Sequence, residues 1–213
     1  MRITKLEHST LVIEQSGKSL ILDPGNFTTP VTDAGDTVAV VITHEHPDHW
    51  TPEQLRRILS KSPDTAIYGP AGVAAAAGDE FDVTVVAPGD TIEAGPFTLR
   101  FFGGEHAVIH SSIPVIDNVG VLINDTVYYP GDSLFVPEDV DIDTLATPAG
   151  APWVKIGEVI DFVLAIAPKR SFPMHDMVLS QAGKNIHFAR IDDATKQGGG
   201  EFFPLQPGEV LDL

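Results

Sequence analysis

The 213-residue chain contains no cysteine, few basic residues and no long apolar run. Without cysteine there can be no disulfide, thiolate zinc cluster, iron–sulfur centre or thiol nucleophile, so any metal must bind histidine or carboxylates. Acidic residues number 30 against 13 basic ones, and the net charge of −17 disfavours nucleic acid as a partner. The N-terminus lacks the apolar segment of a secretory signal, and no run approaches the roughly 18 apolar residues of a membrane span. We therefore expect a cytoplasmic protein with no membrane partner.

The rest of the composition is typical of a globular protein, because 43% of the residues are hydrophobic and 20% are charged. No linker, repeat or low-complexity segment divides the chain. Residues 1–213 are therefore expected to form a single domain with one substantial core.

Short apolar and β-branched runs, separated by turn residues, predict a chain rich in strands. The run 37–43 is almost continuously apolar, which is typical of a strand covered on both faces. Further strands are predicted at residues 10–14, 19–22, 66–68, 83–86, 91–93, 97–102, 118–123, 126–129 and 201–205.

Helical signals occur in both halves of the chain. Thr51 is a predicted N-cap with proline at the next position, so a helix is expected from Pro52 to about Leu59. Apolar residues at i, i+3 and i+4 spacing predict a second helix over residues 156–167, and residues 180–196 are expected to form a third. Helices interspersed with strands favour a layered α/β arrangement over a purely parallel, doubly wound sheet.

The densest chemical signal lies in the loop that follows the strand at 37–43. This loop holds His44, His46, Asp48 and His49. Alternate residues of an extended segment point to the same side, so His44 and His46 can approach one point while the turn at Pro47 directs Asp48 and His49 towards another. The pattern predicts two adjacent metal positions, and imidazole with carboxylate suits zinc, manganese or iron.

With this loop the chain resembles the metallo-β-lactamase superfamily of metallohydrolases, whose hallmark is His-x-His-x-Asp-His after a strand. The other family motifs have counterparts in the expected order at Asp23, His106, Asp132 and His175. The likeness spans almost the whole chain, and the fold that it implies is a four-layer αββα sandwich.

The resemblance also implies a role for each of these residues. His44, His46 and His106 would bind the first of two divalent ions, Asp48, His49 and His175 the second, and Asp132 would bridge them. Asp23 would orient a ligand by hydrogen bonding. Asp48 and Asp132 are the predicted catalytic residues, and zinc is favoured over manganese or iron as the metal. A bound metal lowers the pKa of its water towards about 7, so metal-bound hydroxide is the expected nucleophile.

Four further residues are alternatives or additions to this set. His110 is the alternative to His106, and His187, in a predicted helix, is the alternative to His175. His110 and Trp153 are also candidates for lining the pocket. His8 is expected on the surface or in a hairpin.

The motifs give only partial guidance on the substrate. The lack of cysteine and of a His-x-x-Gly-His-Thr segment separates the chain from several branches of the superfamily, and it looks closest to the ascorbate-6-phosphate lactonase-like group. Between Lys61 and Lys155 the only basic residue is Arg100. A phosphate clamp would therefore have to come from Lys155, Lys169 or Arg170.

We therefore predict a dinuclear metal-dependent hydrolase that uses metal-bound hydroxide on a small ester, lactone or phosphodiester. The alternatives are a non-catalytic metal-binding regulator or subunit of the same fold, and a nuclease, which the acidic charge disfavours. The expected partner is a small-molecule substrate, and a homo-oligomer is left open.

Overall fold

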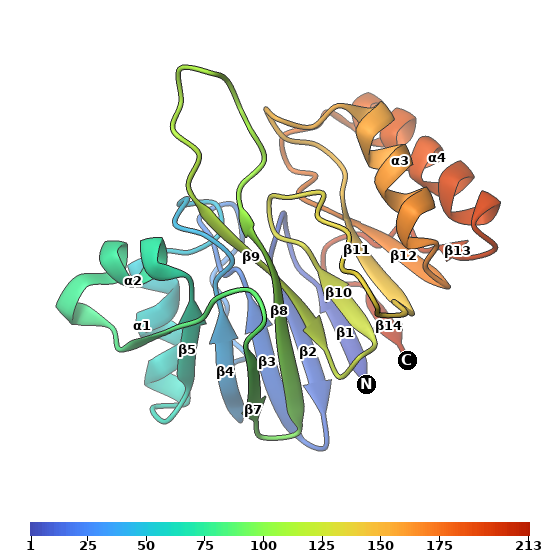
Figure 1. Cartoon of the computed structure of the whole chain (residues 1–213). Helices are drawn as coiled ribbons and strands as arrows, with labels where there is room; N and C mark the ends of the chain where they lie inside the picture. The colour runs from blue at the N-terminus through green and yellow to red at the C-terminus, as the bar shows by residue number, and fades with distance from the viewer.

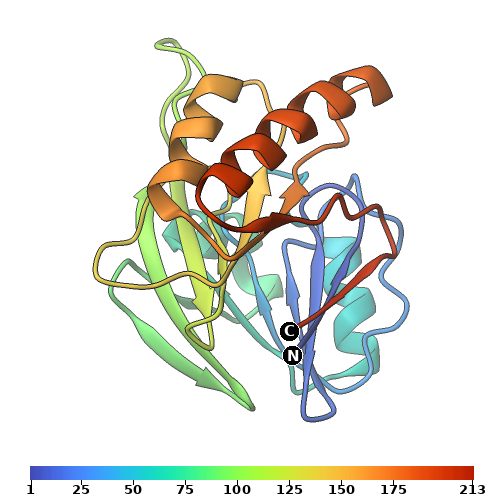
Figure 2. The same ribbon diagram turned by 90° about the vertical axis from the view of Figure 1, so that its right-hand side faces the viewer.

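The computed structural model describes all 213 residues as two seven-stranded sheets packed face to face, with helices on their outer surfaces (Figures 1 and 2). The first sheet, in the order β14-β1-β2-β3-β4-β5-β6, comprises β1 (Arg2–Lys5), β2 (Leu11–Gln15), β3 (Lys18–Leu22), β4 (Thr37–Val41), β5 (Ala66–Gly69), β6 (Val83–Val85) and β14 (Val210–Asp212). The second, in the order β13-β12-β11-β10-β9-β8-β7, comprises β7 (Thr91–Ala94), β8 (Phe97–Glu105), β9 (Asp117–Ile123), β10 (Val127–Tyr129), β11 (Thr144–Pro148), β12 (Arg170–Met174) and β13 (Glu201–Phe202). The helices are α1 (Pro52–Lys61), α2 (Ala71–Ala77), α3 (Ile156–Ile166) and α4 (Gln181–Gln197), with a 3₁₀ turn at Gly78–Glu80. These layers confirm the predicted αββα sandwich.

Strand directions place the ends of several strands together. In the first sheet β2 is antiparallel to both β1 and β3, and β4 is parallel to β3, so β1, β3 and β4 run the same way. In the second sheet β8, β10, β11 and β12 likewise share one direction. The loops that follow these strands therefore gather at one end of each sheet, beyond the carboxyl ends of the strands, where sites in layered α/β folds form.

Apolar side chains fill three interfaces between the layers. A cluster of 22 buried residues lies between the two sheets, including Leu20, Val41, Phe101 and Phe172. A second cluster packs α1 and α2 against the first sheet, and a third packs α3 and α4 against the second sheet. Each sheet is thus covered on both faces, which explains the continuously apolar run in β4.

The helices agree closely with the sequence signals. The Thr51 hydroxyl accepts a hydrogen bond from the Gln54 amide at 3.2 Å, which confirms the predicted N-cap, and α1 continues two residues beyond Leu59. Helix α3 begins at Ile156 as predicted and ends before Ala167, whose φ of 48° is left-handed. None of the helices has the length and apolar character needed to span a bilayer.

The strands from β2 to β10 were predicted with small errors at their ends. Strand β4 stops at Val41 instead of residue 43, because Ile42 and Thr43 already begin the histidine loop. The C-terminal strand predicted at 201–205 is limited to Glu201–Phe202. Strands β1, β11, β12 and β14 were not predicted.

Candidate metal centre

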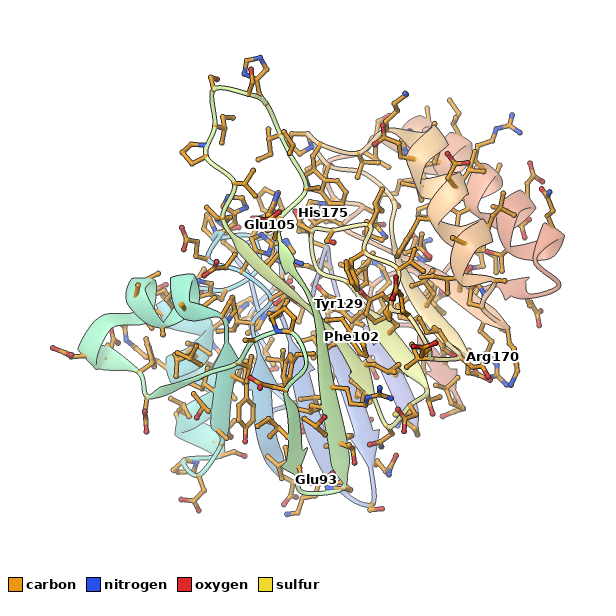
Figure 3. The ribbon with its side chains drawn as sticks, viewed as in Figure 1. Glu93, Phe102, Glu105, Tyr129, Arg170 and His175 are labelled. Carbon is orange, nitrogen blue, oxygen red and sulfur yellow. The ribbon has the colours of Figure 1, made fainter.

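Six loops bring the candidate residues together at one end of the sandwich. The first sheet supplies His8 after β1, Asp23 after β3 and the 44–49 segment after β4, and the second supplies His106 after β8, Asp132 after β10 and His175 after β12. Figure 3 shows His175 and Glu105 at this end, whereas Glu93 lies at the opposite end of the sheets. Loops from both sheets therefore build one site.

Eight side chains form two adjacent groups that could each hold a metal ion. One group is His44, His46, His106 and Asp132, and the other is His8, Asp48, His49 and His175. Within each group the nearest nitrogen or oxygen atoms all lie within 4.8 Å of one another. The seven ligands predicted from the sequence thus all lie in these two groups, and His8 is an addition.

Unpartnered buried atoms show that this residue set fits divalent ions. Five buried side-chain polar atoms in the protein lack a hydrogen-bond partner, and four of them are His49 Nε2, His106 Nε2, His175 Nε2 and Asp132 Oδ1. His49 Nε2 lies 3.1 Å from Asp132 Oδ1, whereas His106 Nε2 and His175 Nε2 lie 3.3 and 3.2 Å from Asp132 Oδ2. Buried polar groups are rarely left unpaired without a reason, and cations held in the two adjacent groups would satisfy these atoms.

Hydrogen bonds at the opposite ring nitrogens fix the imidazoles in the orientation that a metal requires. The Nδ1–H groups of His106 and His175 donate to the carbonyl oxygens of Ala107 (2.6 Å) and Gly150 (2.7 Å). His44 Nδ1–H donates to the Thr43 hydroxyl oxygen at 3.0 Å. With the proton held at Nδ1, each Nε2 presents its lone pair to the site.

Asp23 orients the site from beneath, where it is fully buried. Its carboxylate accepts hydrogen bonds from the Thr43 amide (2.8 Å), the Thr43 hydroxyl (2.7 Å), His49 Nδ1–H (2.6 Å) and the Tyr129 hydroxyl (2.8 Å). These contacts join the loop after β3 to the histidine loop and to β10. Asp23 belongs to neither ligand group. It holds His49 in place through this hydrogen bond.

Opposite charges within the buried site shift the pKa values of His49, Asp132 and His175. Burial lowers the pKa of His175, but the charge of Asp132 together with the hydrogen bonds to Asp132 and Asp48 outweighs it and raises that pKa to about 9. For His49, likewise, burial is outweighed by the charges of Asp132 and Asp23, which raise the pKa well above its ordinary value. Burial also raises the pKa of Asp132, but the charges of His175 and His49 hold it well below its usual range. These shifts favour a negatively charged Asp132 carboxylate paired with the protonated imidazoles of His49 and His175.

His8 is the residue that sequence reasoning missed. It is fully buried instead of lying on the surface, and its Nε2 lies 3.1 Å from Asp48 Oδ2, to which it donates. The Met177 amide approaches His8 Nδ1 at 3.4 Å, which is consistent with the proton at Nε2. Burial lowers the pKa of His8 to about 4. His8 follows β1 as Asp23 follows β3, so predicting β1 as a strand would have made His8 a candidate.

The remaining candidates are divided between the site and the surface. Trp153 is buried and its indole N–H donates to Asp132 Oδ2 at 2.9 Å, so it contacts the site directly. His110 is exposed, contacts Ser112 and lies outside both ligand groups. His187 donates to the Ala149 carbonyl oxygen at 2.6 Å and is also outside them.

The basic residues considered for a phosphate clamp form ion pairs with acidic residues outside the two ligand groups. Lys169 and Arg170 lie at the start of β12 and both pair with Asp143, which precedes β11. His175 follows the other end of β12. The labels of Arg170 and His175 in Figure 3 lie well apart. Lys155 is exposed and lies 3.8 Å from Glu158. The interpretation of these residues as a clamp is therefore not supported by their positions.

Comparison with known proteins gives a consistent family. The sequence profile of the beta-lactamase superfamily domain matches residues 2–175. Protein Rv0786c of Mycobacterium tuberculosis (strain ATCC 25618 / H37Rv) is 37% identical over 200 residues, which cover 92% of this chain and 93% of that protein.

Solved structures of lower identity share the fold. A protein from Parabacteroides distasonis assigned as a metal-dependent hydrolase has a TM-score of 0.77 at 22% identity, over 94% of this chain and 90% of that one. Igni18, a metallo hydrolase from Ignicoccus hospitalis, has a TM-score of 0.74 at 17% identity, over 99% and 97%. CmlA, a diiron β-hydroxylase from Streptomyces venezuelae, has a TM-score of 0.76 at 14% identity, over 100% of this chain and 54% of that one.

Proposed function

The chain belongs to the metallo-β-lactamase superfamily, and on this premise we propose that it is a dinuclear metal-dependent hydrolase of a small ester, lactone or phosphodiester. The observation that carries the proposal is the convergence of four unpartnered buried atoms from His49, His106, Asp132 and His175. Residues 1–213 act as one hydrolase domain, and the net charge of −17 supports a small-molecule substrate over nucleic acid.

Each ligand has a proposed place. His44, His46 and His106 would hold the first ion, Asp48, His49 and His175 would hold the second, and Asp132 would be shared by both. The bridging role is supported by its two oxygens, since Oδ1 faces His49 and Oδ2 faces both His106 and His175. Zinc is the proposed metal, and manganese or iron suits the same nitrogen and oxygen ligands.

When bound, the two ions supply Lewis acidity and a water of lowered pKa, which is a nucleophile at neutral pH. The protein's own residues do the rest. The Trp153 indole N–H donates to the Asp132 side chain and the Asp132 amide donates to Asn118 Oδ1, which holds Asp132 in position, and Asp23 keeps the His49 proton at Nδ1. Asp48 accepts a hydrogen bond from His8, which limits its rotation. Because the proposed ligand set has only two carboxylates, Asp48 and Asp132, among its imidazoles, a site loaded with two divalent ions would keep surplus positive charge able to stabilise an oxyanion.

The nearest branch that we propose is the ascorbate-6-phosphate lactonase-like group, because of the Asp48–Trp50 and Gly131–Ser133 segments. This likeness is limited to two segments that carry proposed metal ligands. A second candidate role is a metal-binding regulator or subunit of the same fold without turnover, which the experiment below distinguishes.

The proposed function is tested by elemental analysis and by hydrolysis assays on protein purified without a chelator. We expect about two transition-metal equivalents per chain, as for a dinuclear hydrolase, and turnover of at least one member of an ester, lactone and phosphodiester panel. His106→Ala should lower the metal content, whereas His110→Ala, the matched control, should not. Two metals without turnover across the panel would favour the regulator, and failure to bind metal after reconstitution would refute both roles.

Metal binding should also release protons. At pH 7 the imidazole of His175, with a pKa of about 9, carries a proton that a metal must displace. The apparent affinity should therefore rise about tenfold per pH unit for each proton released as the pH approaches 9, and then level off. Calorimetric titration in buffers of different ionisation enthalpy measures this release. An affinity that is constant between pH 6.5 and 9 would contradict the ligand role of His175.

A further inference from the structure

Exposed apolar side chains are concentrated around the metal centre. Nine large hydrophobic side chains are exposed in the protein, and seven belong to loops that carry or adjoin the ligands: Phe27, Val108, Ile113, Val115, Phe135, Met177 and Val178. The other two are Val85 and Ile186. Phe27 packs edge-on against the His8 ring, with centroids 4.9 Å apart, so this apolar rim reaches both ligand groups. Apolar surface gathered at one place usually marks a binding site.

One side of this rim is hollowed into an open cleft of about 630 Å³. His106 lines the cleft and also belongs to the first ligand group, so the cleft borders the metal centre at this residue. Its apolar walls are Val108, from the loop between β8 and β9, and Leu134 and Phe135, from the loop that carries Asp132. Figures 1 and 2 show that the β8–β9 loop extends beyond the ends of the sheets.

The wall at Phe135 is held in place by its backbone. The Phe135 carbonyl oxygen accepts a hydrogen bond from the Tyr128 hydroxyl at 3.0 Å, and its amide donates to the Ser133 hydroxyl oxygen at 3.0 Å. The side chain itself is 41% exposed and takes no part in these contacts. It is thus a preformed apolar surface, and its replacement leaves the backbone contacts intact.

The cleft offers no positive charge to an anionic substrate. None of its lining residues is basic, and Glu105 adds a negative charge. Lys5 and Lys184 both form ion pairs with Asp176, the residue after His175, at 3.1 and 2.7 Å, so their charges are already compensated. A phosphate or carboxylate on the distal part of a substrate would therefore be desolvated without compensation.

We propose that the substrate is an uncharged ester or lactone with an aliphatic acyl chain of several carbons, and that this chain lies in the cleft between Val108 and Phe135. The inference rests on the proposed hydrolase function. In the reaction the oxygen of water bonds to the carbonyl carbon, the bond from that carbon to the leaving oxygen breaks, and the leaving oxygen takes up a proton. The cleft contributes affinity for the chain beside the reacting carbonyl.

The test is a series of p-nitrophenyl esters from acetyl to octanoyl, assayed with the metal-loaded protein below the micelle concentration of each ester. A fully buried methylene is worth about a fourfold gain, so in this open cleft we expect about a twofold rise in kcat/KM per methylene. Esters of equal length that end in a carboxylate should lose most of this gain. Phe135→Ser should flatten the dependence on chain length, whereas Ile186→Ser, which changes an exposed apolar residue on α4 away from the cleft, should leave it unchanged.

Binding without turnover separates this inference from the proposed function. Octanamide, which is uncharged, should shift the methyl NMR signals of Val108 and Leu134 in the metal-free protein, and acetamide should not. Hydrolysis without chain-length preference would overturn the apolar subsite and leave the hydrolase standing. Methyl shifts with octanamide, but no hydrolysis of any ester by protein holding two metals, would sustain the subsite and overturn ester hydrolysis. Neither shifts nor hydrolysis would overturn both.

Discussion

Replacing Asp132 with alanine should remove metal and hydrolytic activity together. Its two carboxylate oxygens lie 3.1–3.3 Å from the Nε2 atoms of His49, His106 and His175, so no other residue faces as many ligands. Without it, the first group loses its only carboxylate and Asp48 alone remains to offset the charge of the second ion. We expect the metal content to fall from about two equivalents to below one, and kcat/KM to fall about a thousandfold, since metal catalysis contributes several kcal/mol.

The matched control for this variant is Asp193→Ala, which removes an exposed carboxylate of α4 that pairs only with Arg190 at 3.1 Å. That variant should retain both metal and activity. Circular dichroism of the two proteins distinguishes loss of ligands from loss of fold. A folded Asp132→Ala protein with undiminished metal content would show that Asp132 is not a bridge.

The fold and the convergence of most candidate ligands could be predicted because the informative residues lie at strand ends. The buried strand β4 gives a continuous apolar run, and the polar density of residues 44–49 begins where that run stops. His106 and Asp132 each follow a strand whose residues have clear β propensity. Local pattern and tertiary position agree at these points, so sequence reasoning succeeds.

The strands that were not predicted explain what the sequence could not reveal. Strands β11 and β12 contain prolines, Pro148 and Pro173, which argue against a central strand, although both lie near the strand ends where they close on the site. Strand β1 has only four residues, two of them basic. Missing β1 hid His8, because nothing in the local sequence indicates that this residue is buried.

Backbone conformation was a further hidden feature. Asp23, His8 and His175 have φ values of 45°, 59° and 56°, in the left-handed region that residues other than glycine rarely adopt. No local sequence pattern predicts these backbone conformations. Strained residues of this kind are retained where the surrounding structure fixes them, and here they direct three side chains into one site.

Replacing Asp23 with asparagine should weaken one of the two metal positions although Asp23 itself binds no metal. The carboxylate now accepts the His49 Nδ1–H at 2.6 Å, and an amide N–H₂ at that place cannot accept it. His49 would then move its proton to Nε2, where the lone pair for the metal is needed. We expect the affinity of one equivalent to fall 10- to 100-fold, and the metal-free protein to lose roughly 1–3 kcal/mol of unfolding free energy.

Asp125→Asn is the control, because Asp125 has nearly the same backbone conformation, with φ of 47°, but its side chain is exposed and pairs with Arg100. It should change neither metal affinity nor stability measurably. The nitrogen chemical shifts of the His49 ring report its tautomer directly, so the mechanism can be checked apart from the affinity. If Asp23→Asn kept both metals at full affinity with the proton still at Nδ1, the orienting role of Asp23 would be disproved, since the hydrogen bond would then not determine which nitrogen faces the metal.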